Sequence, residues 1–311
     1  MLPEYGLITG FSADSRLLVV GGWKDFRLWR LADGAVTTFP LDNYDARGLN
    51  GWADVHGIEP YGVFGMTNGV LEHWNLATMS RVASWQVHEG EVSTAEFSPD
   101  GRFIATSGTN GDVKLWDVKT HREVRRFKAL GRKLLCLTFS PDGRLLAGST
   151  HNVKPLVCLW DVNQGSLLRE LDGFNGLEPS LAFSPDGKLL ATAHRDHSAR
   201  LWEIPSGNLK ATLKGHVARV PGVAFSPDGK TLATGGYDRK VKLWNIATEQ
   251  ELATLELLPG SCLTLRFSPD GRTLAAGSYL GSEPYMSLWQ VSSFKEIDAV
   301  PATLKTGSKQ P

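Results

Sequence analysis

The sequence has few of the features that mark a membrane or secreted protein. Its 311 residues include only three cysteines, Cys136, Cys158 and Cys262, and no Cys-x-x-Cys pair. An odd number of cysteines in apolar strand contexts predicts small buried side chains in a reducing compartment. No apolar run approaches the ~18 residues of a membrane span, and the first residues show neither a charged leader nor an apolar stretch. We therefore expect a cytoplasmic protein that does not associate with membranes.

Net charge and catalytic motifs are also lacking. The 33 basic and 33 acidic residues cancel, so the surface as a whole has no general attraction for nucleic acid. No Gly-x-Ser-x-Gly or His-Glu-x-x-His motif is present. Gly229-Lys230-Thr231 resembles the end of a phosphate-binding loop, but Ala224 stands where that loop requires glycine. We expect no catalytic residues, no metal, no cofactor and no nucleic-acid partner.

What the sequence does contain is a repeat of about 42 residues. A turn pentapeptide, Phe-Ser-Pro-Asp-Gly, recurs in steps of 42 to 44 residues and begins at Phe97, Phe139, Phe183, Phe225 and Phe267. A second series has steps of 42 to 45 residues and consists of Trp29, Trp74, Trp116, Trp160, Trp202, Trp244 and Trp289. Seven tryptophans in phase indicate seven units, and this period with several short strands is typical of propeller blades.

The unit over residues 215–255 shows why each repeat forms a small sheet. Proline, aspartate and glycine in Ser226-Pro227-Asp228-Gly229 suit a hairpin turn that closes with a left-handed glycine. β-formers flank this turn, and two further turns separate two more strands. One such four-stranded sheet cannot bury both faces, so neighbours must stack in a closed ring. We predict an all-β fold: one seven-bladed β-propeller of four-stranded antiparallel blades.

The blades are predicted within a single domain over residues 1–300, followed by a disordered tail over residues 301–311. Their approximate bounds are 7–40, 41–83, 84–130, 131–173, 174–214, 215–256 and 257–300. The second unit lacks the pentapeptide, and residues 53–57 occupy the approximate place of the turn. This irregularity indicates either that the repeat has decayed in sequence or that blade two was released from the repeat pattern to form a binding surface. The seventh unit contains an insertion around residues 280–284.

The predicted ring closes without a strand borrowed from the N-terminus. Six residues, Pro3 among them, precede the first inner strand. We therefore expect the last blade to take its own outer strand from about Phe294 to Val300. Closure would then depend on packing between blades one and seven.

The unit resembles the WD repeat, whose elements are Gly-His, a Phe-Ser-Pro-Asp-Gly turn and Leu-Trp-Asp. The resemblance covers residues 7 to about 299, although a literal Trp-Asp pair occurs only at Trp116-Asp117 and Trp160-Asp161. It implies a seven-bladed propeller that binds other proteins and has no catalysis of its own. The near-identical copies are similar to bacterial WD-repeat proteins, which are often fused to kinases or proteases. The alternatives are therefore a regulatory or sensor propeller of a larger protein, or a propeller enzyme with a site at the channel mouth.

The resemblance also implies a buried set of hydrogen-bonded side chains in each unit: a histidine, a threonine or serine, an aspartate and the tryptophan. The sixth unit matches in full with His216, Thr234, Asp238 and Trp244. The third matches in part with His88, Thr106, Asn110 and Trp116. The fifth has Thr192, Asp196 and Trp202 but no histidine. A structural role is expected, because a buried indole N–H and a buried imidazole both need partners.

Two surface sets are candidates for binding a protein partner. The first gathers aromatic, arginine and mouth-lining residues on loops around the channel, and consists of Trp23, Glu91, Lys133, Phe174, Arg195, Arg219, Tyr237 and Tyr279. Aromatic and arginine side chains are frequent anchors at interfaces; the alternative is that each is a solvated loop residue. Only one mouth position carries a carboxylate, which disfavours an enzyme.

The second set is a run of positive charge on the outer strand of blade three and the following loop, with Arg122, Arg125, Arg126, Lys128 and Arg132 as its members. It indicates either a solvated edge that discourages sheet-to-sheet aggregation or a site for an acidic or phosphate-bearing partner. Together these patterns predict a monomeric, non-catalytic protein-interaction scaffold whose partners the sequence does not name.

Overall fold

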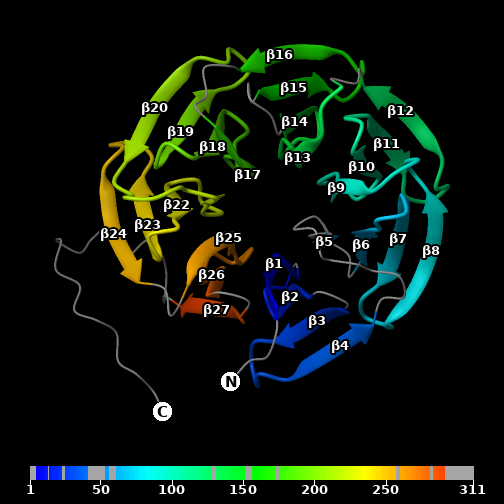
Figure 1. Cartoon of the computed structure of the whole chain (residues 1–311), viewed down its shortest axis with the longest axis horizontal. Coiled ribbons are helices and arrows are strands. Elements are labelled where there is room, and N and C mark those ends of the chain that lie inside the picture. Colours follow the sequence, from blue (N-terminus) through cyan, green and yellow to red (C-terminus); the bar gives the residue numbers. More distant parts are fainter. Residues whose placement is uncertain are drawn as a thin grey trace.

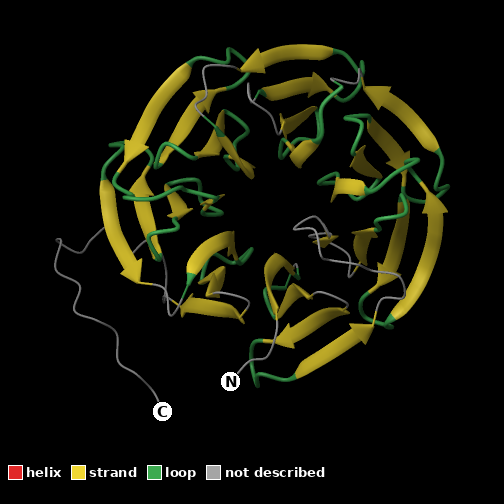
Figure 2. Ribbon diagram, viewed as in Figure 1, coloured by secondary structure: helices red, strands yellow, loops and turns green. Residues whose placement is uncertain are grey.

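The computed structural model describes residues 5–12, 14–22, 25–40, 53–55, 61–127, 131–150, 156–171, 176–256, 260–280 and 283–290. Seven antiparallel sheets stand around a central channel, and sequence order runs once around the ring (Figure 1). The part of the chain that is described consists of strands, turns and loops, with no helix (Figure 2). The predicted all-β, seven-bladed fold is confirmed.

The strands of the first four blades follow in chain order from the channel to the rim. Blade one has β1 (Tyr5–Phe11), β2 (Leu17–Gly22), β3 (Asp25–Arg30) and β4 (Val36–Pro40). Blade two has β5 (Ala53–Val55), β6 (Tyr61–Gly65), β7 (Val70–Asn75) and β8 (Ser80–Gln86). Blade three has β9 (Val92–Phe97), β10 (Phe103–Gly108), β11 (Val113–Asp117) and β12 (Glu123–Phe127). Blade four has β13 (Leu134–Phe139), β14 (Leu145–Thr150), β15 (Val157–Asp161) and β16 (Leu167–Leu171).

The remaining blades repeat this order. Blade five has β17 (Leu177–Phe183), β18 (Leu189–His194), β19 (Ser198–Glu203) and β20 (Leu209–Lys214). Blade six has β21 (Gly222–Phe225), β22 (Thr231–Gly235), β23 (Lys240–Asn245) and β24 (Glu251–Glu256). Blade seven has β25 (Ser261–Phe267), β26 (Thr273–Leu280) and β27 (Glu283–Gln290) among the described residues. Because neighbouring strands are antiparallel, the loops between blades and the second–third strand loops share one end of the ring, called here the loop face.

The turn between the first two strands of a blade has one hydrogen-bond pattern. In blade five, the Ser184 hydroxyl donates to Asp186 Oδ1 at 2.6 Å and accepts the Leu189 N–H at 2.9 Å. Gly187 closes the turn at a φ of 70°, a conformation that costs a residue with Cβ about 1–2 kcal/mol. The same serine–aspartate bond recurs in the pentapeptide turns of blades three, four, six and seven. The predicted turn chemistry is therefore confirmed.

The hydrophobic core is divided among the joints between blades. Seven clusters of buried side chains occur, and each joins two neighbouring blades. Between blades three and four, for example, Leu115 and Phe127 pack with Leu146 and Trp160. No blade buries its faces alone, so apolar burial stabilises the ring as a whole.

Packing and hydrogen bonds join blades one and seven. Ile8 and Phe11 pack with Ala275 of blade seven, and the Ile8 N–H donates to Thr264 Oγ1 at 3.1 Å. Tyr5 pairs with Gly22 inside blade one and so does not extend blade seven. The predicted outer strand over residues 294–300, the residues before Tyr5 and the predicted tail over residues 301–311 lie outside the described residues. The absence of a borrowed strand therefore stays a prediction.

One local expectation needs correction, in blade two. Residues 53–55 form the inner strand of blade two rather than its turn, because Val55 pairs with Gly62 as Phe97 pairs with Ile104 in blade three. The sequence placed the turn too early because no pentapeptide marked it. The insertion of blade seven lengthens the hairpin of β26 and β27, which pair as far as Leu280 and Glu283.

Candidate protein-interaction face

The buried hydrogen-bond set of blade six is complete. Trp244 Nε1 donates to Thr234 Oγ1 at 2.8 Å, and Thr234 Oγ1 lies 2.8 Å from His216 Nε2. His216 Nδ1 lies 2.9 and 3.0 Å from the two carboxylate oxygens of Asp238. A neutral imidazole with its proton on Nδ1 satisfies this chain, because the threonine hydroxyl then donates to Nε2. Burial lowers the pKa of His216, although Asp238 acts in the opposite direction.

Blade three has the same chain as far as the histidine. Trp116 Nε1 donates to Thr106 Oγ1 at 2.9 Å, and Thr106 Oγ1 lies 2.9 Å from His88 Nε2. The Asn110 side-chain amide, expected in place of the carboxylate, donates to Asp112 at 2.7 Å. Burial and the charge of Lys114 lower the pKa of His88 to about 4, so this imidazole is neutral at neutral pH.

Blade five builds an equivalent set with a histidine that the sequence analysis missed. Trp202 Nε1 donates to Thr192 Oγ1 at 2.9 Å, and His194 Nε2 lies 2.7 Å from the same oxygen. Arg200 lies 2.8 Å from His194 Nδ1 and also donates to Asp196. Because a guanidinium has no acceptor, Nδ1 must accept and Nε2 must carry the proton. The tautomer in blade five is therefore the reverse of that in blade six.

A histidine from the loop before the inner strand and a histidine on the second strand would occupy the same space, so a blade has room for only one of them. His194 lies on β18, two residues after Thr192, where blades three and six have Gly108 and Gly236. A Cβ at Gly108 would lie 2.8 Å from His88 Nδ1, and one at Gly236 would lie 2.4 Å from His216 Nδ1. Glycine thus makes room for a histidine from the loop, and His194 fills that room from the strand. The sequence did contain a signal for this site, because blade five has a histidine at the position where blades three and six have glycine.

Other blades depart from the set. In blade four Gly148 replaces the threonine, and Trp160 Nε1 is buried without a hydrogen-bond partner among the described residues. In blade two Trp74 Nε1 donates instead to Glu72 at 2.8 Å, and Glu72 also forms an ion pair with Arg81 at 2.8 Å. Sets that join the tryptophan, the threonine and a histidine therefore occur in blades three, five and six.

The sets of blades five and six hold the neighbouring loops in place. The Val217 N–H donates to Asp238 at 3.0 Å, so the carboxylate that binds His216 also fixes the loop before β21. The Tyr237 N–H donates to the Arg219 carbonyl at 2.8 Å and joins that loop to the one between β22 and β23. The backbone of blade six is thereby fixed while the Val217 side chain remains 78% exposed.

The structure brings three of the predicted face residues together. Arg195, Arg219 and Tyr237 lie on loops of blades five and six and are exposed. Glu91 and Lys133 lie at blades three and four, where they form an ion pair with each other at 3.5 Å. Tyr279 lies in β26 opposite Ser261, and its side chain is not among those described. Trp23 and Phe174 also lie outside the described residues.

The predicted basic patch is not one continuous surface. Arg122 precedes β12 and Arg132 follows it, so they lie at opposite ends of the strand. Arg126 forms an ion pair with Glu123 at 3.1 Å. The Arg125 stem packs over the turn of blade four, because a Cβ at Gly165 would lie 2.9 Å from it. Lys128 lies outside the described residues. These contacts favour a solvated edge that also packs against the next blade.

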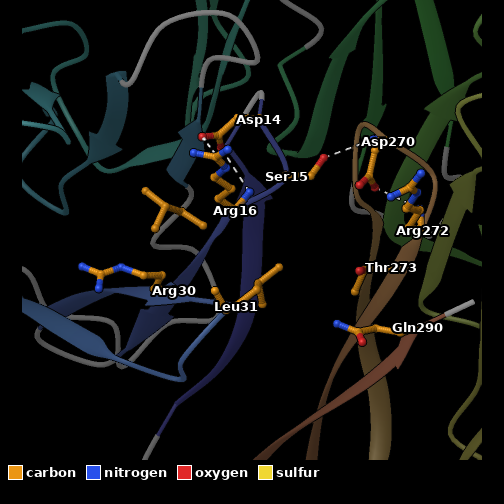
Figure 3. Close-up of a pocket in the computed structure, with 11 residues that line it drawn as sticks. Asp14, Ser15, Arg16, Arg30, Leu31, Asp270, Arg272, Thr273 and Gln290 are labelled. Atoms are coloured by element: carbon orange, nitrogen blue, oxygen red, sulfur yellow. Dashed lines mark hydrogen bonds and ion pairs between the residues drawn. The ribbon is translucent and has the colours of Figure 1, made fainter. Parts of the chain in front are cut away.

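A cavity of about 800 Å³, which the sequence did not indicate, opens between blades one and seven (Figure 3). It lies at the end of the ring opposite the loop face, beside the turns that contain Asp14 and Asp270. Charged side chains of opposite sign lie next to each other along its lining. Asp14 lies 3.9 Å from Arg16. Arg30 of the lining lies 2.9 Å from Asp33, which is just outside it. Hydrogen bonds from Ser12 and from the Arg16 N–H lower the pKa of Asp14.

Comparison with protein families identifies the repeats. The model "WD domain, G-beta repeat" matches residues 79–117, 165–203 and 207–245. These matches end just after Trp116, Trp202 and Trp244, the tryptophans of the polar sets in blades three, five and six. A search of curated proteins found no matching relative. Within the described part of the chain, no helix has the length and apolar character of a membrane span. The fold is therefore a seven-bladed β-propeller in which three repeats match the WD-repeat family model.

Proposed function

We propose that this propeller is a non-catalytic scaffold that binds other proteins through its loop face. The observation that carries the proposal is the organisation of blades five and six. The Val217 N–H donates to Asp238 and the Val220 N–H donates to the His194 carbonyl, which holds the loop before β21. Arg219, Tyr237 and Val217 remain exposed on the loops of blade six. Loops that are already ordered lose little conformational freedom on binding, which favours recognition at such a surface.

The proposal includes a cytoplasmic location for a ring that acts as a monomer. Cys136, Cys158 and Cys262 are all free and buried. Burial raises the pKa of the Cys136 and Cys158 thiols to about 12, so these thiols are protonated and unreactive at neutral pH. Free thiols of this kind suit a reducing compartment.

An affinity pull-down with the Arg219→Glu/Tyr237→Ala variant tests the proposed face. We expect the variant to lose the partners that the wild-type chain captures, because both side chains belong to the exposed loops of blade six. The Arg144→Glu/Lys188→Glu variant is the control, since these exposed residues lie in turns at the opposite end of the ring. Capture of the same partners by wild type and both variants would show that binding occurs elsewhere.

A further inference from the structure

Among the described residues, the corner of the loop face formed by blades five and six presents several positive charges. Arg195, Arg219 and Arg239 are exposed on its loops. Two of the carboxylates nearby are paired internally: the Asp238 side chain is 3% exposed and pairs with His216, and Asp196 pairs with Arg200. Glu256, exposed at the end of β24, lies opposite Lys240. The exposed Arg219 and Arg239 therefore set a positive potential over the loops before β21 and between β22 and β23.

Apolar side chains stand beside these charges. Val217 is 78% exposed and Tyr237 is 40% exposed. The backbone bond from Tyr237 to Arg219 places the tyrosine loop next to the loop that contains Val217. Tyrosine and arginine are enriched among the residues that anchor protein interfaces. The corner thus offers an apolar contact within a rim of positive charge.

The same face has the opposite character at blade three. Glu89 is exposed on the loop before β9, and Asp112 is partly exposed between β10 and β11. Glu91 nearby forms an ion pair with Lys133. A long polyanion that crossed the channel mouth would meet these carboxylates, whereas a short acidic segment confined to blades five and six would not. The charge distribution therefore favours a peptide segment over a nucleic acid.

We infer that the blade five–six corner binds a short acidic segment of a partner protein that also carries an apolar side chain. The inference rests on the proposed function and adds the chemistry of the partner. Acidic side chains of the segment pair with Arg219 and Arg239, and the apolar side chain packs on Val217 and Tyr237. The ordered loops are complementary in charge to such a segment before it arrives, which increases its association rate and its specificity.

Selection from a phage library of random 12-residue peptides on the full-length chain tests the inference. We expect the recovered peptides to be enriched in aspartate and glutamate beside an aliphatic or aromatic residue. A synthetic consensus peptide, measured by fluorescence anisotropy, should bind Arg219→Glu/Arg239→Glu at least tenfold more weakly than wild type. Arg144→Glu/Lys188→Glu, with the same change of charge at the opposite end of the ring, should bind within twofold of wild type. Affinity should fall severalfold between about 50 and 200 mM salt.

The other outcomes separate the two proposals. If the recovered peptides lack acidic residues yet bind Arg219→Glu/Tyr237→Ala poorly, the loop face is right and the acidic partner is wrong. If they bind both variants as wild type does, both proposals fail. Recovery of no peptide above background, or tighter binding of a 12-residue oligothymidylate than of any recovered peptide, overturns the acidic-peptide assignment. Circular dichroism of each variant excludes loss of folding as the cause.

Discussion

At the scale of single residues, one position decides where the histidine of each polar set comes from. Blades three and six have Gly108 and Gly236 there and receive His88 and His216 from the preceding loop. Blade five has His194 at that position, with Arg200 where blade six has Lys242. Each arrangement gives the buried threonine and tryptophan a hydrogen-bond partner. Which arrangement a blade adopts therefore depends on which neighbouring side chain can form a hydrogen bond with the second nitrogen of the imidazole.

This exclusion predicts strong coupling between two substitutions in blade six. Gly236→His alone places a side chain against His216 and should cost about 3 kcal/mol or more. His216→Gly alone leaves Asp238 and Thr234 without their partner and should cost about 2–4 kcal/mol. Combined with Lys242→Arg, the two changes rebuild the arrangement of blade five and should recover much of the loss. Denaturant unfolding of the single, double and triple variants measures the coupling, and additive losses would contradict the exclusion.

The buried histidines also predict the pH dependence of stability. Burial, with the charge of a neighbour, lowers the pKa of His73 and His88 to about 4 and of His194 to about 3. Below about pH 6.5 the unfolded chain binds protons that the folded chain does not. The free energy of unfolding should therefore fall between pH 6.5 and 4. The carboxylates with lowered pKa values, such as Asp100 and Asp186, lose their contribution at lower pH.

Unfolding by guanidinium at pH 7, 6 and 5 measures this dependence. The loss for the wild type should exceed that for His88→Gln at each step, because glutamine does not titrate. An unfolding free energy that stays constant from pH 7 to 5 would show that the histidines are accessible to protons in the folded state. The comparison also separates the histidines from the carboxylates, which titrate below this range.

The set of blade six could be predicted from the sequence because each of its four residues lies at the family's spacing. His194 could not, because the family's histidine lies in the loop before the inner strand, whereas His194 lies on the second strand of its blade. Only the packing shows that Gly236 and His194 occupy one position and that Arg200 reaches the imidazole. The gathering of Arg195, Arg219 and Tyr237 was predictable from loop order, whereas the Glu91–Lys133 ion pair required the fold.

At the scale of the element, the serine–proline–aspartate–glycine turn is the most regular feature of the chain. Its glycines all have a φ near 70°, for example 69° at Gly143 and 71° at Gly229. Blade one keeps the serine–aspartate bond between Ser12 and Asp14 but has Ser15 at a φ of 59°. The turn therefore tolerates the loss of glycine when its side-chain bonds remain.

Two glycine substitutions of opposite effect test this account of the turn. Gly187→Ala should destabilise by about 1–2 kcal/mol, because alanine is strained at positive φ while its Cβ would meet nothing closer than 3.8 Å. Gly222→Ala lies in β21 with ordinary contacts of 3.5 Å or more and should be neutral or stabilising by about 0.5 kcal/mol. Thermal unfolding of both variants measures the difference. Equal effects would mean that packing, and not backbone conformation, controls the turn.

The strands and turns could be predicted accurately only in the blades where the sequence repeat is regular. Five pentapeptides predicted the turns of blades three to seven, and all five share the serine–aspartate bond. In blade two Val55 replaces the motif phenylalanine, so the sequence placed the turn two residues too early. In blade six, β21 begins at Gly222, directly after Pro221, which has no N–H to pair.

At the scale of the whole molecule, the core is a cycle of seven interfaces rather than one centre. Neighbours such as blades four and five are joined by the chain itself as well as by packed side chains such as Leu181 and Trp202. Among the described residues, blades one and seven are joined only by side-chain packing and by hydrogen bonds from Ile8 and Asp270. This joint is therefore the place where the ring should open first.

A matched pair of core truncations tests that conclusion. Ile8→Ala and Leu181→Ala each remove a buried side chain and should each cost about 2–5 kcal/mol in unfolding free energy. Hydrogen exchange should separate them. Ile8→Ala should speed exchange in β1, β2 and β25–β27 while β17–β23 stay protected, because opening at this joint breaks no connection along the chain. Leu181→Ala should leave β25–β27 near wild-type protection. If Ile8→Ala instead speeds exchange equally in all blades, the ring opens only as a single cooperative unit, and the joint between blades one and seven is no weaker than the others.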